Sequence, residues 1–218
     1  QGPGSVNGWG DITEGFTMQY TWTVPHDVQG YINLAGKKLF EKRLDDLFTV
    51  ELPDDIPGAH DIQGRIGGYW HGNEPCHHIA YLYNYLGKPW KCQKWIREIV
   101  ARFYGNEPGS LSGNDDCGQM SAWYVLASSG IHPICPGNPC YEITSPVFEK
   151  VEFRLDLAYA KGKSFVIKTY NNSPENIYIQ SAQLNGKPYD KSYLMHSDLI
   201  KGGELVLEMG NIPSDWGK

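Results

Sequence analysis

The spacing of the apolar residues changes from a helical to a strand-like period near Pro146. Before this point, apolar side chains recur at intervals of three and four residues, which is the spacing of amphipathic helices. After it, apolar and polar residues alternate, as around Val151 and Phe153, and turn-forming residues separate the alternating runs, which indicates β-strands. The sequence therefore predicts an α+β chain, with a helical part at residues 1–135 and an antiparallel β module at residues 136–218.

Helices are predicted where glycine or proline punctuates the apolar period. Pro25 should mark a start or a kink within the first helix, and a proline is allowed in the first turn of the third. The Pro-, Asp- and Gly-rich stretch at residues 53–68 has the length of loops that often line functional sites. The predicted helices are residues 19–35, 37–48, 73–86 and 88–104, followed by one that begins after Asp115 and Asp116 and ends near residue 129.

Composition and charge exclude some functions. The chain has 218 residues, 40% hydrophobic content and a formal net charge of −6, which permits a sizeable core and argues against nucleic-acid binding. No apolar run reaches the roughly 18 residues of a membrane span, and the start lacks the features of a signal peptide. Since Gln1 is not a natural initiator, we expect a processed or excised piece.

Five cysteines form an odd set. Cys135 and Cys140 flank a Pro-Gly-Asn-Pro turn, and this spacing permits a disulfide. The alternative is five unpaired thiols, and the sequence leaves both interpretations open.

Two adjacent carboxylates, Asp115 and Asp116, come directly before the last predicted helix. The unbonded N–H groups and the positive end of the helix dipole at such a position favour ionised carboxylates. This setting suits a general base or an oxygen-ligated metal ion, and it does not suit a proton donor. The alternative is that both residues are helix caps, since aspartate is a preferred capping residue.

Several motifs follow one another in the order found in a known enzyme family. They are Gly-Asn-Asp-Asp-Cys-Gly-Gln-Met-Ser-Ala-Trp-Tyr-Val at 113–125, with residues 130–136 and 145–148 after it, residues 14–15, 19–22 and 25–27 near the start, and His-Gly-Asn-Glu-Pro at 71–75 with His77 and His78. In these motifs the chain closely resembles the calcium-dependent exo-acting α-mannosidases of glycoside hydrolase family 92.

The resemblance implies part of an (α/α)6 helical barrel followed by closing strands. Members of the family carry an N-terminal β-sandwich domain before the barrel, and this sequence matches only the C-terminal portion of that plan. A partial barrel would expose apolar helix faces. We therefore expect either association with a partner chain that carries the missing N-terminal part of the enzyme, or a rearranged association.

The resemblance also implies a pair of catalytic carboxyl groups. Glu14 matches the general acid of the family, and Asp116, with Asp115 beside it, matches the general base. The family inverts the anomeric configuration, so the acid and base carboxyl groups should lie roughly 6.5 to 9.5 Å apart, with a water molecule between them. Trp22 and Trp70 are expected near Glu14, where apolar neighbours would raise its pKa.

Calcium is the implied cofactor, and this ion prefers oxygen ligands. The expected ligands are Glu74, Asp115 and Asn73. A zinc site at His71, Glu74 and His78 is an alternative, but a proline interrupts the helix that would place these side chains on one face.

Substrate contacts are expected from residues that adjoin the motifs and from the loop at residue 60, which should form the leaving-sugar subsite. Aromatic rings stack on sugar faces, although aromatic residues are more often core material. His26 and Asp27 either form a hydrogen-bonded pair that orients the acid loop, or His26 is an ordinary core histidine. The residues expected to contact substrate are Gln19, Trp22, His60, Trp70 and His71.

The expected function is the release of non-reducing terminal α-linked mannose from mannose-containing oligosaccharides or glycoprotein glycans, including N-glycans. One alternative is a non-catalytic mannoside-binding or assembly fragment, and another is an (α/α)6 glycosidase that acts on a different sugar. Because the family usually acts outside the cytoplasm, a bacterial protein of this kind is expected in the periplasm or at the cell surface. The linkage preference stays open.

Overall fold

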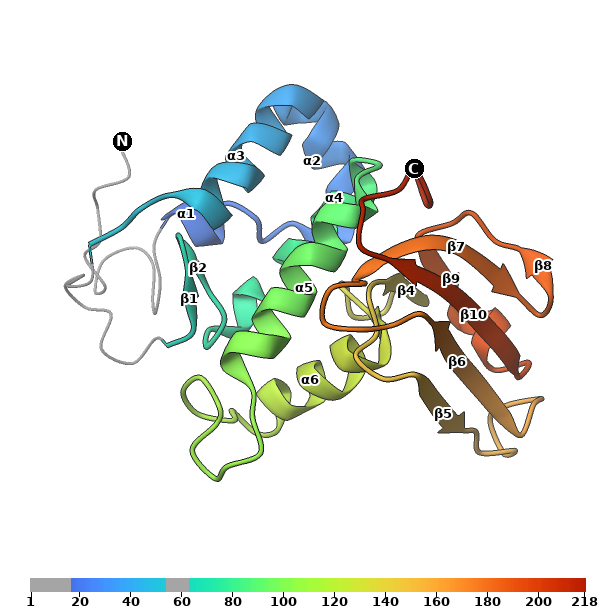
Figure 1. The fold of residues 1–218 in the computed structure, drawn as a ribbon. Coiled ribbons are helices and arrows are strands. Elements are labelled where there is room, and N and C mark those ends of the chain that lie inside the picture. The colour runs from blue at the N-terminus through green and yellow to red at the C-terminus, as the bar shows by residue number, and fades with distance from the viewer. Residues whose placement is uncertain (1–16, 54–62) are drawn as a thin grey trace. The chain divides into compact units, whose positions relative to one another are not determined.

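The computed structural model describes residues 17–53 and 63–218 (Figure 1). The chain forms two compact units: described residues up to 79 with residues 101–122, and residues 80–100 with 123–218. The predicted boundary at residue 135 divides the chain at one position, whereas each compact unit combines two separate segments, so this boundary stays a prediction. Within the described ranges, no helix has both the length and the apolar character that crossing a membrane requires.

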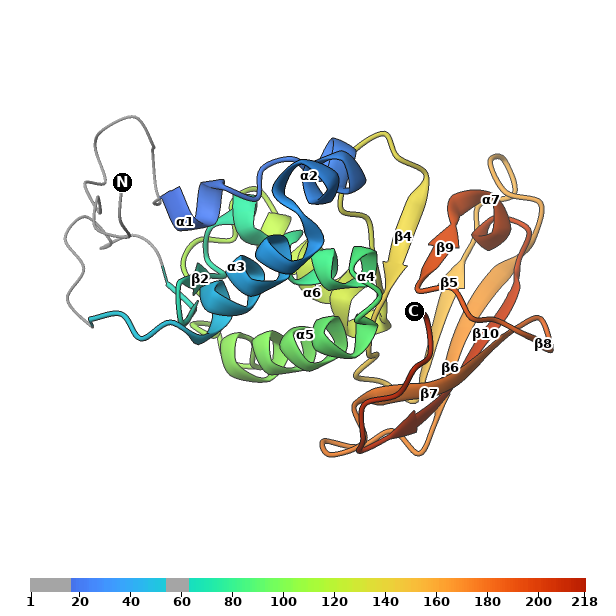
Figure 2. The same ribbon diagram turned by 90° about the horizontal axis from the view of Figure 1, so that it is seen from above.

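The first unit begins with short helices and a helical hairpin, in which α2 and α3 lie side by side (Figure 2). The elements are α1 (Thr17–Tyr20), the 3-10 turn η1 (Pro25–Asp27), α2 (Val28–Ala35) and α3 (Lys37–Thr49). Gly36 joins α2 to α3 with a φ of 81°, a conformation that glycine adopts readily. The predicted helix at 37–48 is confirmed, and its buried face is the predicted one: Phe40, Leu44, Leu47 and Phe48.

The predicted helix at residues 19–35 is broken into separate pieces, and one of them begins at Pro25, where the sequence predicts a start or a kink. Pro25 has no backbone N–H to donate, so it begins a new 3-10 turn. The Asp27 carboxylate accepts a hydrogen bond of 2.8 Å from the backbone N–H of Gly30 and caps α2. His26 is exposed. Asp27 is therefore a helix cap, and its predicted pair with His26 is not formed.

The predicted helix at residues 73–86 is also wrong. The structure has the strands β1 (Arg65–Ile66) and β2 (Tyr69–Trp70), then the 3-10 turns η2 (Glu74–Cys76) and η3 (Ile79–Tyr81), and then α4 (Leu82–Tyr85). The backbone N–H groups of Cys76 and His77 each donate at 3.0 Å to a carbonyl three residues earlier. The side chains of His77 and His78 bond to other backbone carbonyls. The backbone bonds therefore have 3-10 geometry, and the histidine side chains reach carbonyls outside the predicted helix.

The two remaining predicted helices are confirmed as α5 (Pro89–Phe103) and α6 (Gln119–Ser129). In α6, Met120, Trp123 and Ala127 are buried as their spacing predicts, whereas Tyr124 is half-buried. The chain is therefore a mixed α and β structure, and the predicted (α/α)6 barrel stays a prediction.

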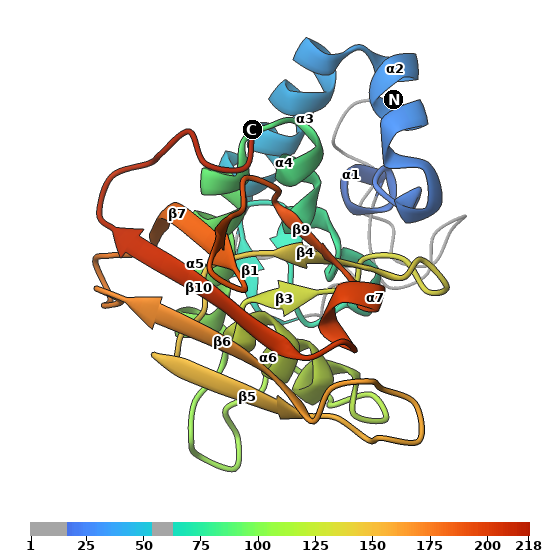
Figure 3. The same ribbon diagram turned by 90° about the vertical axis from the view of Figure 1, so that its right-hand side faces the viewer.

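The second unit carries two β-sheets (Figure 3). The five-stranded sheet has the order β5-β6-β10-β7-β8, and its strands are β5 (Lys150–Arg154), β6 (Ser164–Tyr170), β7 (Tyr178–Leu184), β8 (Lys187–Pro188) and β10 (Gly203–Gly210). The three-stranded sheet has the order β3-β4-β9, from β3 (Ile131–His132), β4 (Cys140–Ile143) and β9 (Tyr193–Met195), which the helix α7 (His196–Leu199) follows.

The prediction of a purely antiparallel module is wrong for one pair of strands, because β10 is parallel to β6. Asn185 and Gly186, with φ values of 52° and 75°, form the tight turn of the β7–β8 hairpin, and such a turn joins antiparallel strands. The chain then passes through β9 and α7 before β10 inserts between β6 and β7. This long return decides the direction of β10, and no local pattern reveals it.

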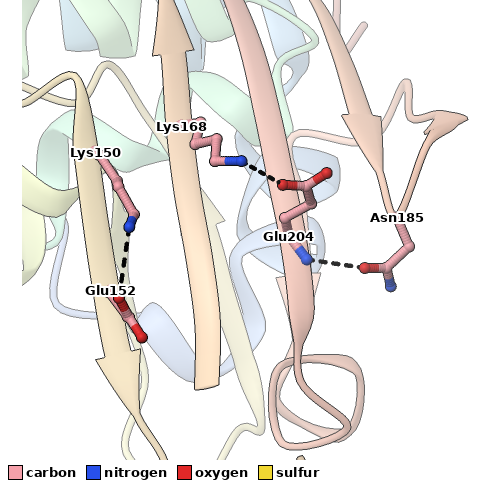
Figure 4. Close-up of polar contacts among 5 residues, drawn as sticks. All are labelled: Lys150, Glu152, Lys168, Asn185 and Glu204. Carbon is pink, nitrogen blue, oxygen red and sulfur yellow. Dashed lines mark hydrogen bonds and ion pairs between the residues drawn. The ribbon is translucent and has the colours of Figure 1, made fainter. Parts of the chain in front are cut away.

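The outer face of the five-stranded sheet is charged (Figure 4). The Lys168 ammonium lies 2.9 Å from the Glu204 carboxylate, and Lys150 lies 3.6 Å from Glu152. The Asn185 side chain accepts a 2.8 Å bond from the backbone N–H of Glu204. The ion pairs are too exposed to add much stability. The stability of the sheet comes from its buried face, which includes Phe165, Ile167, Ile179, Leu205, Leu207 and Met209.

Candidate active site

The loop before α6 holds Asp115 and Asp116 in different environments. Oδ1 of Asp115 accepts hydrogen bonds from the backbone N–H and the hydroxyl of Ser121, at 2.9 and 2.8 Å. Asp115 therefore caps the first turn of α6, as one interpretation of the sequence predicts. Asp116 is exposed, and its φ of 48° lies in the left-handed region, which non-glycine residues seldom adopt. The loop fixes one carboxylate to the helix and presents the other to solvent.

A chain of hydrogen bonds, centred on a buried histidine, runs from β2 to the first turn of α6. His71 is fully buried, with Nδ1 2.9 Å from the Tyr69 hydroxyl and Nε2 2.6 Å from the Tyr104 hydroxyl. The Tyr104 hydroxyl donates to the carbonyl oxygen of Met120 at 3.1 Å. Its oxygen must then accept from Nε2–H of His71, and Nδ1 of a neutral imidazole accepts from Tyr69. Each hydroxyl and ring nitrogen in this chain therefore has a defined role.

His77 ties the segment after β2 to α6. Its Nε2 donates to the carbonyl oxygen of His71 at 3.0 Å, and its Nδ1 accepts from the side-chain amide of Gln119 at 3.2 Å. Burial lowers the pKa of His77 to about 4, and the smaller opposing effects include the bond to His71 and the negative charge of Asp116. The imidazole is therefore neutral at pH 7, which agrees with one donating and one accepting nitrogen.

Two glycines allow the loop at residues 105–118 to approach the segment at residues 63–73. A Cβ added at Gly72 would lie 2.5 Å from the backbone oxygen of Ser112, and one added at Gly64 would lie 2.7 Å from its Oγ. Both distances are too short for a real Cβ, so the packing itself requires glycine. A hollow of about 240 Å³, lined by residues 102–105 and 109–112, lies beside this loop and is smaller than the ~300–1,000 Å³ of typical ligand pockets.

Glu14 and His60 lie outside the described residues. The predicted separation of the Glu14 and Asp116 carboxyl groups, and the predicted leaving-sugar subsite at His60, therefore stay predictions.

The other residues expected to contact substrate are buried. Gln19, Trp22 and Trp70 are 1%, 2% and 4% exposed. The Trp22 ring packs edge-on against Phe40 with centroids 5.1 Å apart, and its carbonyl accepts from Nε2 of His78 at 2.7 Å. Trp22 and Trp70 therefore lie in the core, as the alternative interpretation of the aromatic residues predicts, and Gln19 is also buried. Their contacts with substrate, like those of the buried His71, stay predictions.

The predicted calcium ligands differ in exposure. Asn73 is buried, whereas Glu74 and Asp115 are half-buried. Calcium requires about six to eight oxygen ligands. In residues 17–53 and 63–218, no group of three or more His, Cys, Asp or Glu side chains is placed to hold a metal ion. Asn73, Glu74 and Asp115 therefore do not form a complete metal site by themselves, and neither does the alternative zinc set.

The five cysteines are unpaired in the structure. Cys76 and Cys92 are buried, Cys117 is exposed, and Cys135 and Cys140 are half-buried. Of the two interpretations that the sequence leaves open, the structure has free thiols at residues 135 and 140.

Tyr104, Ser112 and Gln119 take part in this site, although sequence reasoning does not single them out. Tyr104 ends the apolar stripe of α5, where a tyrosine is usually a core residue whose hydroxyl reaches a polar partner. Gln119 lies inside the longest motif, at residues 113–125, and this position is the feature of the sequence that points to it. The partners of Tyr104 and Gln119 are distant in sequence, so only the fold identifies these bonds.

Comparison with known proteins agrees with the motifs. The sequence profile of the glycosyl hydrolase family 92 catalytic domain matches residues 2–211. The chain belongs to this family, which confirms the resemblance seen in the sequence.

Several relatives are similar over most of the chain. The structure of a family GH92 α-mannosidase from Bacteroides thetaiotaomicron in complex with mannoimidazole is 64% identical, with a TM-score of 0.91 over 99% of this chain and 28% of that one. An inverting family GH92 mannosidase from the same bacterium is 37% identical, with a TM-score of 0.79 over 93% of this chain and 28% of that one. An uncharacterized secreted glycosidase from Arthroderma benhamiae is 32% identical over 197 residues, which are 89% of this chain and 23% of that protein.

The chain therefore spans about a quarter of the length of these relatives, between 23% and 28%.

Proposed function

We propose that the protein is an exo-α-mannosidase that releases non-reducing terminal α-linked mannose from oligosaccharides or glycoprotein glycans. The observation that carries this proposal is the 64% identity, over 99% of the chain, to an α-mannosidase whose structure holds mannoimidazole. The exposed Asp116 supplies a carboxylate that can act as the general base, and Asp115 beside it is held by Ser121.

The proposed reaction is a single displacement with inversion. Asp116 accepts a proton from a water molecule whose oxygen attacks the anomeric carbon as the glycosidic bond breaks. Glu14 donates its proton to the departing oxygen, so the leaving sugar departs as an alcohol. Asp115, which Ser121 holds in place, keeps the loop attached to α6. The name of the 37% identical relative, an inverting mannosidase, supports this stereochemistry.

The substitution Asp116→Asn in the complete protein tests the base. It removes the proton acceptor while keeping the size of the side chain, so the rate of mannose release should fall by about 10²–10⁴-fold with an unchanged thermal midpoint. Asp190→Asn changes another exposed aspartate, on the segment after β8, and should leave the rate unchanged. A wild-type rate in the Asp116→Asn variant would refute the assignment.

The acid has a separate signature in the same assay. Glu14→Gln should strongly lower the rate of hydrolysis of natural mannosides. It should lower the rate much less for aryl mannosides with good leaving groups, because a stable leaving anion needs little protonation. NMR of the first product should show β-mannose, as inversion requires. An α-mannose product would instead indicate a retaining mechanism.

A second candidate function is mannoside binding without catalysis by this chain alone. This chain covers 28% of the solved α-mannosidase, and this partial coverage favours the second candidate. In that case, a complete active site also needs residues from the remaining 72%. Residues 1–218 expressed alone should then release no mannose, and co-expression with the rest of the protein should restore release. Full activity of the isolated residues would exclude this candidate.

We also propose that the protein acts outside the cytoplasm, in the periplasm or at the cell surface of a bacterium. The name of the Arthroderma benhamiae relative, a secreted glycosidase, supports an exported protein.

A further inference from the structure

The loop that carries Asp115 and Asp116 is closed at its base by one hydroxyl group. Tyr104 directly follows α5, and Met120 lies in the first turn of α6, so these two residues flank the whole loop. The 3.1 Å bond from the Tyr104 hydroxyl to the Met120 carbonyl oxygen joins the two ends. Closing a loop at its stem restricts every residue within it.

A buried histidine fixes the direction of this hydroxyl. Because the Tyr104 hydroxyl donates to Met120, its oxygen accepts from Nε2 of His71, 2.6 Å away, in the tautomer that carries the proton on Nε2. His71 is in turn oriented by the Tyr69 hydroxyl on its other nitrogen, at 2.9 Å. The Phe103 ring also stacks on the imidazole, with centroids 6.0 Å apart and an interplanar angle of 14°. The bond that closes the loop is therefore preorganised.

The same hydroxyl lies near one of the two carboxylates. Burial is the main cause that raises the pKa of Tyr104, and the negative charge of Asp115 raises it further. The phenol therefore stays protonated, and remains a hydrogen-bond donor, at neutral pH. The opposite side of the loop rests against Gly72, through the backbone oxygen of Ser112.

We propose that Tyr104 is a positioning residue for the base: its hydroxyl, held by His71, closes the loop at residues 105–119 and so sets where Asp116 stands. This inference rests on the proposed function. Tyr104 itself does not touch the reacting atoms in this assignment. Its effect on the reaction passes through the backbone of Met120 and the loop.

The substitution Tyr104→Phe, made in the complete protein, removes the hydroxyl and keeps the ring. The loop then loses its closing bond, so kcat should fall roughly 10- to 100-fold, since a displacement of about 1 Å in a catalytic group has an effect of this size. KM should stay within about threefold of wild type, because sugar binding does not require the base. Hydrogen exchange of the backbone amides at residues 105–119 should become faster.

Tyr69→Phe is the matched control. It removes a hydroxyl from the other nitrogen of the same histidine, and this hydroxyl is more deeply buried than that of Tyr104, but the bond from residue 104 to Met120 stays in place. It should cause at least as large a loss of thermal stability with a much smaller loss of kcat and unchanged exchange in the loop. Equal losses of kcat in the two variants, or a wild-type kcat with Tyr104→Phe, would overturn the inference.

Gly72→Ala displaces the loop from its other side and carries the test if Tyr104→Phe yields no folded protein. The added methyl group meets the Ser112 backbone oxygen, so kcat should again fall more than KM rises. An unchanged kcat in that variant would contradict the role of loop position. Failure of the proposed function is distinguishable, because it would appear as undiminished mannose release by Asp116→Asn.

Discussion

Glu142, in β4, shows how burial changes the chemistry of a single residue. It is 4% exposed and accepts a hydrogen bond of 2.8 Å from the side-chain amide of Asn84. Burial raises the pKa of Glu142 to about 7 from its ordinary value of 4.5, while the hydrogen bonds from Asn84 and Tyr85 act in the opposite direction. Between these two pH values the folded chain keeps a proton that the unfolded chain has lost.

Stability should therefore fall as pH rises from about 4.5 to 7, because the unfolded state binds fewer protons there. The full difference in pKa corresponds to roughly 3 kcal/mol. Glu142→Gln removes this titration, so its urea midpoint should change less between pH 5 and pH 8 than that of the wild type. Glu152→Gln, on the exposed face of β5, should follow the wild type. An identical pH dependence in wild type and Glu142→Gln would contradict the assignment.

Single residues also show which parts of the site can be predicted from the sequence. Aspartates directly before a helical period predict a cap, and Asp115 is one. Tyr104 gives no such signal, because its partners His71 and Met120 are 33 and 16 residues away. The role of its hydroxyl depends on three segments meeting, which a local pattern does not encode.

At the scale of elements, regular apolar spacing predicts the long helices. The segments at 37–48 and 88–104 form α3 and α5. The segment at 73–86 forms two 3-10 turns and α4 instead, and the side chains of His77 and His78 hold it to the carbonyls of His71 and Trp22 outside the segment. The exception falls on a segment that the motifs mark as functional, where local rules are often broken.

Gly130 ends α6 and provides a test of an element boundary. Its φ is 95°, and an added Cβ would lie 2.5 Å from Cγ of Pro146. Gly130→Ala should therefore incur backbone strain of about 1–2 kcal/mol and a further 1–3 kcal/mol from crowding. Gly137→Ala is the control, because its φ of 84° is similar and nothing lies within 4 Å. Chemical denaturation should show the larger loss for Gly130→Ala, and equal losses would mean that crowding at Pro146 is relieved without cost.

At the scale of the whole molecule, we expect calcium to link stability to activity. We expect exhaustive chelation of the complete protein to lower mannose release and the thermal midpoint together, since an ion that binds only the folded state stabilises it by about 2.7 kcal/mol at 100 times its Kd. Added calcium should restore both. Glu74→Gln should weaken the response to calcium, and Glu152→Gln, outside the proposed site, should not. Unchanged activity and midpoint after chelation would exclude the cofactor.

The order of the strands is likewise a property of the whole fold. The alternation of apolar residues predicts β6, β7 and β10, and the Asn185-Gly186 pair predicts the β7–β8 hairpin. The parallel pairing of β10 with β6 follows from a long connection that returns the chain between two strands already formed. Burial of Leu205 and Leu207 in the shared core holds β10 there.

The sequence by itself determined the mixture of helices and strands, the confirmed helices, the strands β5, β6, β7 and β10, and the family, and it offered the cap at Asp115 as one of two alternatives, because spacing, turn chemistry and long motifs are local properties of the chain. Only the tertiary structure decided the direction of β10, the burial of Trp22 and Trp70, and the closure of the loop at residues 105–119 by Tyr104. These features depend on contacts between residues far apart in sequence, whose energies arise only when the packed core brings them together.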